Sequence, residues 1–302
     1  MSLTRFTIHG WIGLVLIATM WPMSWLQIQP VAEHHFFFLW LGYILIVDVL
    51  VLTRRGSSLL SRSRLAFAGL FFASLPVWWL FEFFNRFVKN WIYLGVEHYG
   101  PIRYAMLASL AFSTVVPAVF ETTELMATFD FVEGFKDRRA VPVTRLILVG
   151  IVVFGLLSFV AMVLWPRYAF PLAWTCVFFV VDPINYALGW PSITAWVSRG
   201  DWRPVITLGA GTLLCGIFWE MWNFYAWPKW IYEIPFVEFL HIFEMPLLGY
   251  GGYLPFGLEL FAIYHFIRGL VGLADVPYVN PVPDRFSQAT QRVWHTGLEP
   301  TN

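Results

Sequence analysis

Acidic side chains inside the apolar stretches of this chain are the residues best able to do chemistry. Six lie within such stretches, and no lysine or arginine lies deep in any of them: Asp48, Glu82, Glu121, Asp182, Glu220 and Glu259. A carboxylate buried in hydrocarbon without a cationic partner is costly when ionised, so it tends to be protonated, to bind a cation or to face water. Such groups can act as general acids and bases or carry protons, and protonated acids can equally serve as hydrogen-bonding contacts between helices.

Glu220 and its neighbours form the most concentrated pattern. Glu220 and Asn223 are three residues apart and share one helix face, where the amide can hold the proton of a neutral acid. Trp219 and Trp222 add flat, apolar walls beside them. We predict that Glu220 and Glu259 form an acid–base or proton-binding pair assisted by Asn223. Trp219 and Trp222 are predicted to contact the substrate.

The chain also contains an internal duplication. Three pairs of acids recur at offsets of 134 to 138 residues: Asp48 with Asp182, Glu82 with Glu220, and Glu121 with Glu259. Flanking residues recur at similar offsets: Trp40 with Trp174, Asn85 with Asn223, and "NWIY" from Asn90 with "KWIY" from Lys229. An offset this constant is not expected of chance matches. We predict a first unit at 1–134, a second at 141–275, and a polar, loosely ordered tail at 276–302.

The duplication extends the predicted site. Glu82 and Glu121 are expected to be catalytic because they are the counterparts of Glu220 and Glu259. Three more side chains are expected to contact the substrate: Tyr232, His265 and Asp182. His265 is the only histidine well inside an apolar stretch.

A separate pattern of acids and histidine lies in the segment before the last apolar stretch. Glu238, His241 and Glu244 follow one another at intervals of three residues, which would place three metal ligands on one helix face. Carboxylate-bridged sites need a second Glu-x-x-His pair, and the first unit offers only adjacent Glu97 and His98. We therefore expect an amphipathic helix on the membrane surface rather than a site for iron, manganese or zinc.

The elements that must position these side chains are membrane-spanning helices. Hydrophobic residues make up 59% of the 302 residues and charged residues 13%, which excludes an ordinary soluble domain. Crossing the hydrocarbon core takes about 20 helical residues. Eight stretches are long enough: 8–26, 36–53, 65–85, 103–125, 144–165, 170–189, 204–226 and 247–271. The predicted fold is an all-α polytopic membrane protein with about eight transmembrane helices.

Basic residues predict the orientation of these helices. The N-terminus, the C-terminus and alternate loops hold 14 Lys and Arg residues, whereas the opposite loops hold 5. Loops rich in basic residues stay in the cytoplasm, so both termini are expected there, in the cell (inner) membrane. Each unit has four spans, an even number, so the two four-helix repeats should be parallel and related by an axis along the membrane normal.

Three classes of function fit these features. An intramembrane enzyme could use protonated Glu and a second carboxylate on a lipophilic, isoprenoid- or lipid-like substrate, with aromatic faces stabilising positive charge. A proton- or cation-coupled transporter would use the same acids by alternating their protonation. A non-catalytic binding or assembly subunit is the third alternative. The balanced charge argues against nucleic acid, so the expected partners are membrane lipid and a lipophilic small molecule. The sequence identifies no cofactor and leaves the oligomeric state open.

Overall fold

The computed structural model describes residues 7–274 and 278–282, and most of them are helical. The long helices are α1 (Ile8–Trp25), α2 (Val31–Arg55), α4 (Arg64–Val88), α7 (Arg145–Leu164), α11 (Arg203–Phe224) and α12 (Tyr253–Leu270). The shorter helices are α3 (Leu59–Arg62), α5 (Pro101–Phe112), α6 (Val115–Met126), α8 (Pro166–Ala169), α9 (Cys176–Ala187) and α10 (Ile193–Val197). The described residues also include three 3₁₀ segments: η2 (Asp130–Phe135), η3 (Phe170–Trp174) and η4 (Leu247–Gly252).

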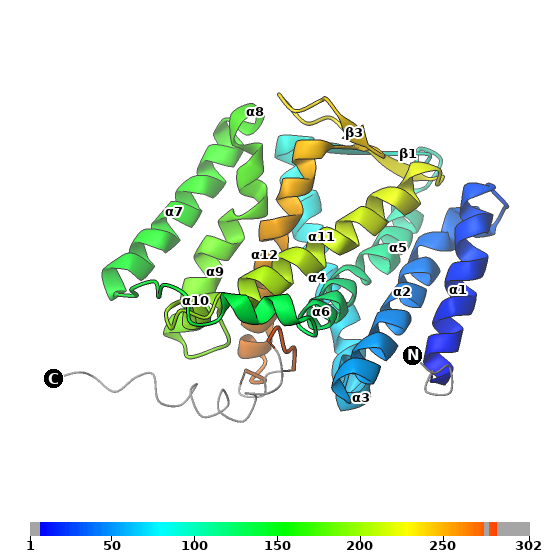
Figure 1. Ribbon diagram of the computed structural model, residues 1–302. Coiled ribbons are helices and arrows are strands. Elements are labelled where there is room, and N and C mark those ends of the chain that lie inside the picture. The colour runs from blue at the N-terminus through cyan, green and yellow to red at the C-terminus, as the bar shows by residue number, and fades with distance from the viewer. Residues whose placement is uncertain (1–6, 275–277, 283–302) are drawn as a thin grey trace.

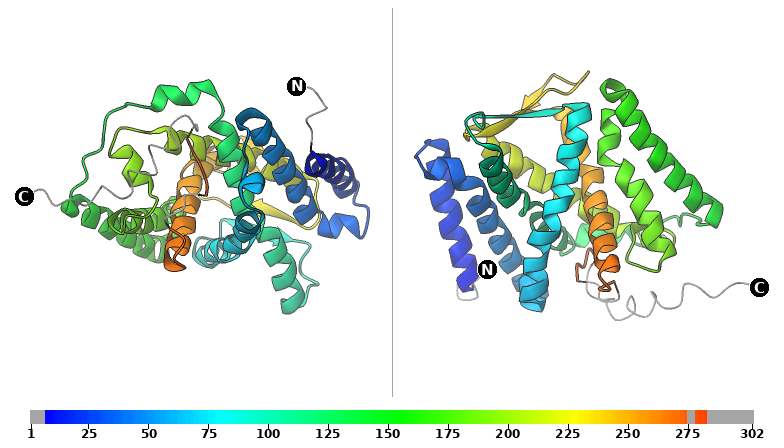
Figure 2. Two further views of the ribbon diagram at one scale, coloured as in Figure 1. Left: turned by 90° about the horizontal axis from the view of Figure 1, so that it is seen from below. Right: turned by 180° about the vertical axis from the view of Figure 1, so that it is seen from behind.

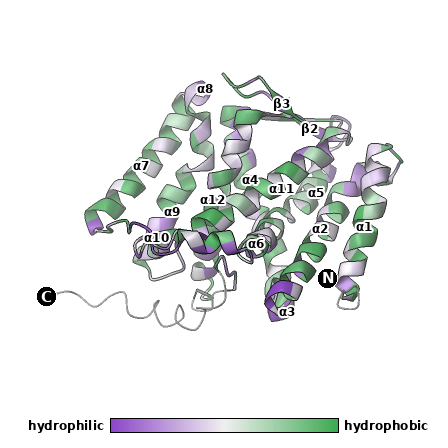
Figure 3. Cartoon of the chain, in the orientation of Figure 1, coloured by the Kyte–Doolittle hydropathy of each residue, from purple (hydrophilic) through white to green (hydrophobic). Residues whose placement is uncertain are grey.

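Within residues 7–274 and 278–282, six helical stretches are long and apolar enough to cross a membrane. They are Val31–Arg55, Arg64–Val88, Pro101–Met126, Arg145–Leu164, Pro166–Ala187 and Arg203–Phe224. Figure 3 shows the apolar character of α2 and α7 and the hydrophilic character of α3. The all-α membrane class is therefore confirmed in its coarse form. The other two predicted spans, α1 and α12, fall outside this set because residues such as His9 and Glu259 lower their mean hydropathy.

Three predicted spans are interrupted rather than continuous. The stretch 103–125 divides into α5 and α6 at Ser113 and Thr114, whose hydroxyls donate to the carbonyls of Leu110 and Ala111 at 2.6 and 2.7 Å. Pro117 contributes to this break because it offers no N–H to a carbonyl four residues earlier. The stretches 170–189 and 247–271 begin as the 3₁₀ segments η3 and η4 and become α-helical only at α9 and α12.

The helical bundle has two distinct ends. α3 and α10 lie at one end, where α1 also begins, whereas β1 (Trp91–Leu94), β2 (Lys229–Tyr232) and α8 lie at the opposite end (Figure 1). We call these the α3 end and the β1 end. Figure 2 shows α4 running from one end to the other. The loops expected to be cytoplasmic, at α3 and α10, therefore lie at the same end of the molecule.

Residues 278–282 are packed against the α3 end. The Tyr278 hydroxyl donates to the Leu59 carbonyl at 2.6 Å, and the Thr207 hydroxyl donates to the Pro281 carbonyl at 2.7 Å. Tyr278, Val279 and Val282 are buried. This short segment is therefore ordered and covered, unlike the loosely ordered tail predicted for 276–302. The rest of that tail lies outside the described residues.

Corresponding helices of the two predicted units pack in corresponding ways. α1 packs along α2, and α7 packs along α9. At the β1 end, β1 and β2 are antiparallel, with Trp91 opposite Tyr232 and Tyr93 opposite Trp230. The two strands that carry the repeated tetrapeptides therefore pair with each other. Between the units lies a core of large buried rings: Trp40, Phe81, Phe120, Trp222, Phe256 and Phe261.

The segment before η4 is not the amphipathic helix that the sequence predicts. It is a loop followed by two short strands, β3 (His241–Ile242) and β4 (Met245–Pro246), which pair with each other. Phe236, Leu240 and Phe243 have positive φ angles of 70°, 52° and 58°, which a right-handed helix does not allow. The three-residue spacing of its polar side chains therefore does not put them on one helix face.

Candidate functional site

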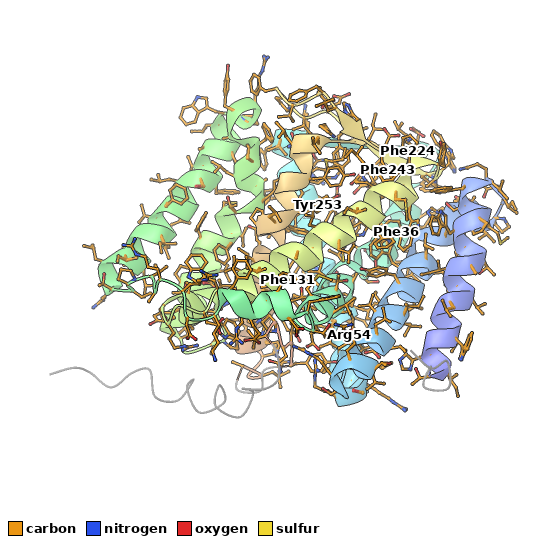
Figure 4. All side chains as sticks on the ribbon, viewed as in Figure 1. Phe36, Arg54, Phe131, Phe224, Phe243 and Tyr253 are labelled. Carbon is orange, nitrogen blue, oxygen red and sulfur yellow. The ribbon has the colours of Figure 1, made fainter. Side chains whose placement is uncertain are left out.

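A cavity of about 410 Å³ lies at the β1 end, between the two predicted units. It is lined by side chains from the start of α2, from α4, α5, α11 and α12, and from the strands β1 and β2. The lining is mainly aromatic, with Trp78, Trp91, Tyr93, Trp230, Tyr232 and Tyr253 among its members. Figure 4 places Phe36 and Tyr253, which both line the cavity, toward the β1 end, far from Arg54 at the α3 end. A concave, mostly apolar site with few polar groups is typical of a small-molecule pocket.

Glu220 lies directly behind this aromatic lining. Its carboxyl is fully buried, and its Oε1 atom accepts hydrogen bonds from the hydroxyls of Tyr232 and Tyr253, both at 2.7 Å. Burial raises the pKa of the Tyr232 hydroxyl well above its ordinary value, so this phenol keeps its proton and donates it to the carboxyl. The ring of Trp219 is stacked on Tyr253, with centroids 6.0 Å apart. The lining tyrosines thus connect the Glu220 carboxyl to the cavity.

Asn223 holds β2 against α11. Its side-chain amide donates to the Trp230 carbonyl at 2.7 Å, and its Oδ1 accepts from the Trp230 N–H at 2.8 Å. Both ends of the amide are therefore bonded to the backbone, rather than to the neighbouring acid as the sequence suggests. The same strand presents Tyr232 to Glu220, so Asn223 positions the hydroxyl donor. Trp222 is buried next to this site, with its ring centroid 5.0 Å from that of Trp40.

Glu82 has a matching environment in the first unit. Its Oε1 accepts hydrogen bonds from the Tyr93 hydroxyl at 2.6 Å and from the indoles of Trp78 and Trp91 at 3.0 and 3.1 Å. Asn85 donates to the Trp91 carbonyl at 2.8 Å, as Asn223 does to Trp230. All three donors to Glu82 line the cavity. Two carboxyls, the fully buried Glu220 and the partly buried Glu82, therefore reach one cavity through tyrosine and tryptophan side chains.

Glu259 and Asp182 bond to the ends of helices instead. Glu259 Oε1 accepts the backbone N–H groups of Val177 and Phe178, at 2.8 and 3.3 Å, in the first turn of α9. Asp182 accepts the N–H groups of Ile193 and Thr194, at 2.7 and 2.9 Å, in the first turn of α10. Such unpaired N–H groups favour carboxylates. In the described part of the chain, neither acid lines the cavity, and Glu259 shares no hydrogen-bond donor with Glu220.

Glu121 and His265 are buried but lie apart from the cavity. Glu121 faces Asp48 and Glu124 near the α3 end. The Nδ1 atom of His265 lies 2.9 Å from the Phe261 carbonyl of its own helix. Neither side chain is among the described residues that line the cavity. The structure therefore gathers Glu220, Glu82, Asn223, Trp219 and Tyr232 around one cavity, with Trp222 buried beside them. It separates these residues from the other predicted site residues, which are Glu259, Asp182, Glu121 and His265.

The residues considered as metal ligands have other partners. Glu238 accepts the Ile234 N–H and lies 3.3 Å from His241 Nε2, whereas Glu244 forms an ion pair with Lys229. Among the residues that the structure describes, no group of three His, Cys, Asp or Glu side chains is arranged to hold a metal ion. The cause is the loop conformation, which directs Glu244 to β2 rather than to His241.

The sequence analysis does not predict four of the side chains that donate to the two carboxyls, which are Trp78, Trp91, Tyr93 and Tyr253. Tyr93 and Trp91 belong to the repeated tetrapeptide, so their counterparts Tyr232 and Trp230 were a usable signal. Tyr253 has no such signal, because it is 33 residues from Glu220 and reaches it only by the packing of α12 on α11. Comparison of the chain with family models, with curated proteins and with solved structures found no match in any of the three.

Proposed function

We propose that the protein is an integral membrane enzyme that performs acid–base chemistry on a lipophilic, isoprenoid-like substrate. The observation that carries this proposal is the aromatic cavity of about 410 Å³, whose wall includes the tyrosine donors to Glu220 and Glu82. Aromatic faces stabilise positive charge, and the few hydroxyls give such a wall a directed source of protons.

In this mechanism Tyr232 and Tyr253 touch the substrate, and Glu220 acts through them. A tyrosine hydroxyl gives its proton to a carbon–carbon double bond while it takes the proton of a neutral Glu220 along the existing 2.7 Å contact. This relay leaves a neutral phenol, a Glu220 carboxylate and a carbocation. Loss of a proton from the rearranged or cyclised carbocation restores the acid. The reaction is redox-neutral and has no net proton consumption, as isomerisation and cyclisation require.

We also propose that the chain is a parallel duplication whose pseudo-two-fold axis passes between β1 and β2. The pairing of Trp91 with Tyr232 and of Tyr93 with Trp230 supports it, because equivalent residues exchange places across such an axis. With α1 and α12 counted as spans the fold has eight, and the basic loops at the α3 end favour the cytoplasm for that end. Both termini would then be cytoplasmic.

A proton-coupled transporter is the second candidate, because buried acids also lie at the α3 end, away from the cavity. To separate the two, isoprenoid polyenes would be added to the protein in lipid nanodiscs and in sealed vesicles. The enzyme converts the substrate to an isomer of equal mass. Uptake of unchanged substrate into vesicles, without conversion in nanodiscs, would contradict the enzyme and support the transporter.

Variants of the site make this experiment specific. Glu220→Gln and Tyr232→Phe should each lower turnover by about 10²-fold or more, since general acid–base catalysis contributes about that much, while substrate stays bound. Tyr225→Phe is the control, because this tyrosine is exposed and near the same helix end. Equal turnover in all three variants would reject the catalytic role of the Glu220 site.

A further inference from the structure

A cluster of buried charges at the α3 end is separate from the cavity. Asp48, Glu121 and Glu124 are each fully buried. Glu124 is bound by Arg62 and lies 3.6 Å from Arg55, and it also accepts the Asn280 N–H at 2.8 Å. One carboxylate is thus surrounded by two guanidinium groups and a backbone donor, which is a favourable site for an ionised acid.

Glu121 lies in a very different environment. Neither of its carboxyl oxygens receives a hydrogen bond from an N–H or O–H group of the described residues. Its carboxyl instead lies within hydrogen-bonding reach of the Asp48 carboxyl. Asp48 accepts the Leu60 N–H at 3.0 Å through Oδ1, and its Oδ2 lies 3.0 Å from His9 Nε2. Two ionised carboxyls in contact would repel each other, whereas one shared proton turns that contact into a hydrogen bond.

The charges of the cluster also favour one shared proton. Three carboxyls face two guanidinium groups, so full ionisation leaves one uncompensated negative charge in a buried place. A single proton on the cluster makes it neutral. The remaining groups that face it are His9 from α1, which is partly exposed, and the phenol of Tyr278 from segment 278–282. Burial raises the pKa of Tyr278, so this phenol stays neutral and adds no charge.

The corresponding acids of the second unit explain why the pair forms in the first unit. Glu259 bonds to the free N–H groups of Val177 and Phe178, because α9 begins there. The equivalent positions in the first unit, 134 residues earlier, are Tyr43 and Ile44. They lie in the middle of the continuous helix α2, where backbone N–H groups are already bonded. Glu121 therefore has no free helix N–H groups to accept from, and its carboxyl contacts the Asp48 carboxyl instead.

We propose that Asp48 and Glu121 form a carboxylic acid–carboxylate pair that binds one exchangeable proton, as a second site independent of the cavity. The pair lies beneath segment 278–282, which Arg62 holds through the Tyr278 carbonyl at 3.0 Å. The ligand of the site is a proton, taken from and returned to water at the α3 end.

Infrared spectroscopy of the purified protein tests this site, because a protonated carboxylic acid has its own C=O stretching band, which shifts in D₂O. Glu121→Gln and Asp48→Asn should each remove the same band from the wild-type spectrum, since either change removes one of three negative charges. The double variant should remove no more than either single variant. Asp182→Asn and Glu259→Gln are the matched controls, and both should retain the band because these carboxyls bond to backbone N–H groups and not to Asp48 or Glu121.

Several outcomes would overturn the proposal. Retention of the band in Glu121→Gln, or loss of two separate bands in the double variant, would mean that the acids do not share one proton. A band that appears only when sodium is removed would make the pair a cation site instead. Should Asp48→Asn not fold, Glu121→Gln carries the test alone, because Gln keeps the shape of Glu. Activity on a lipophilic substrate does not enter this measurement, so its result is independent of the proposed enzyme.

Discussion

Removal of the two tyrosine hydroxyls that bind Glu220 has an effect that can be worked out from the geometry. Tyr232 and Tyr253 donate to the same atom, Oε1, at 2.7 Å, and Oε2 receives no hydrogen bond among the described residues. A hydrogen bond contributes about 0.5–1.5 kcal/mol between neutral groups and about 1.5–3 kcal/mol to a charged group. We therefore expect Tyr232→Phe and Tyr253→Phe each to lower the free energy of unfolding by about 1–2 kcal/mol.

The double variant should cost more than the sum of the two single variants. It leaves a fully buried carboxyl without its two hydroxyl donors and with only the Trp230 indole near it, so the group carries most of its desolvation penalty. Adding Glu220→Leu to the double variant should recover part of the loss, because the buried carboxyl that lost its donors is then absent and only the Trp230 indole still lacks its acceptor, the Tyr232 hydroxyl. Unfolding in mixed detergent micelles measures each free energy, with Tyr225→Phe as the exposed control.

Two results would refute this reasoning. One is a Tyr232→Phe or Tyr253→Phe variant as stable as Tyr225→Phe, which would mean that the hydroxyls do not stabilise the carboxyl. The other is a further loss of stability when Glu220→Leu is added to the double variant. That loss would show that the carboxyl is satisfied by groups other than these tyrosines.

Two further predictions concern packing and orientation. Gly257→Ala should lower the free energy of unfolding by about 1–3 kcal/mol, because an added Cβ would lie 2.2 Å from Thr212 Oγ1 where α12 crosses α11. Gly150→Ala is the control and should leave stability unchanged, because a Cβ added there has no neighbour within 4 Å. Thermal unfolding of both variants in detergent measures the difference. When intact cells are treated with a membrane-impermeant maleimide, Arg139→Cys should be protected from labelling and Tyr168→Cys should be labelled. The native Cys176 and Cys215 should not interfere, because both are buried. The reverse labelling pattern would contradict the predicted orientation.

The sequence predicts the membrane helices well because their signal is local. Long apolar runs specify α2, α4, α7 and α11 whatever surrounds them. The break between α5 and α6 was missed, although Pro117 and the hydroxyls of Ser113 and Thr114 are visible in the sequence. The helix expected at Glu238, His241 and Glu244 was wrong, because a three-residue spacing is compatible with a loop that has positive φ angles.

The site could be predicted only in part, for a physical reason. Glu220 and Glu82 were recognisable as acids inside apolar runs, because such runs are a local feature of the sequence. Their partners are set by long-range packing: β1 pairs with β2, and Tyr253 reaches Glu220 from another helix. The separation of Glu259 from Glu220 depends on where α9 begins, since that helix end supplies the donors to Glu259. The sequence shows which residues are acids, but it does not show which side chains or backbone groups bind each acid in this fold.

The proposed enzyme requires that the aromatic cavity hold a lipophilic molecule. Native mass spectrometry of the purified protein, followed by solvent extraction, compares wild type with Ala108→Trp, which adds an indole to the cavity wall. Gly150→Trp is the control, at an open position on α7. We predict one ligand of defined mass in wild type and in the control, and its loss from Ala108→Trp. Equal ligand content in all three proteins, or bulk membrane phospholipid alone, would contradict the proposed site.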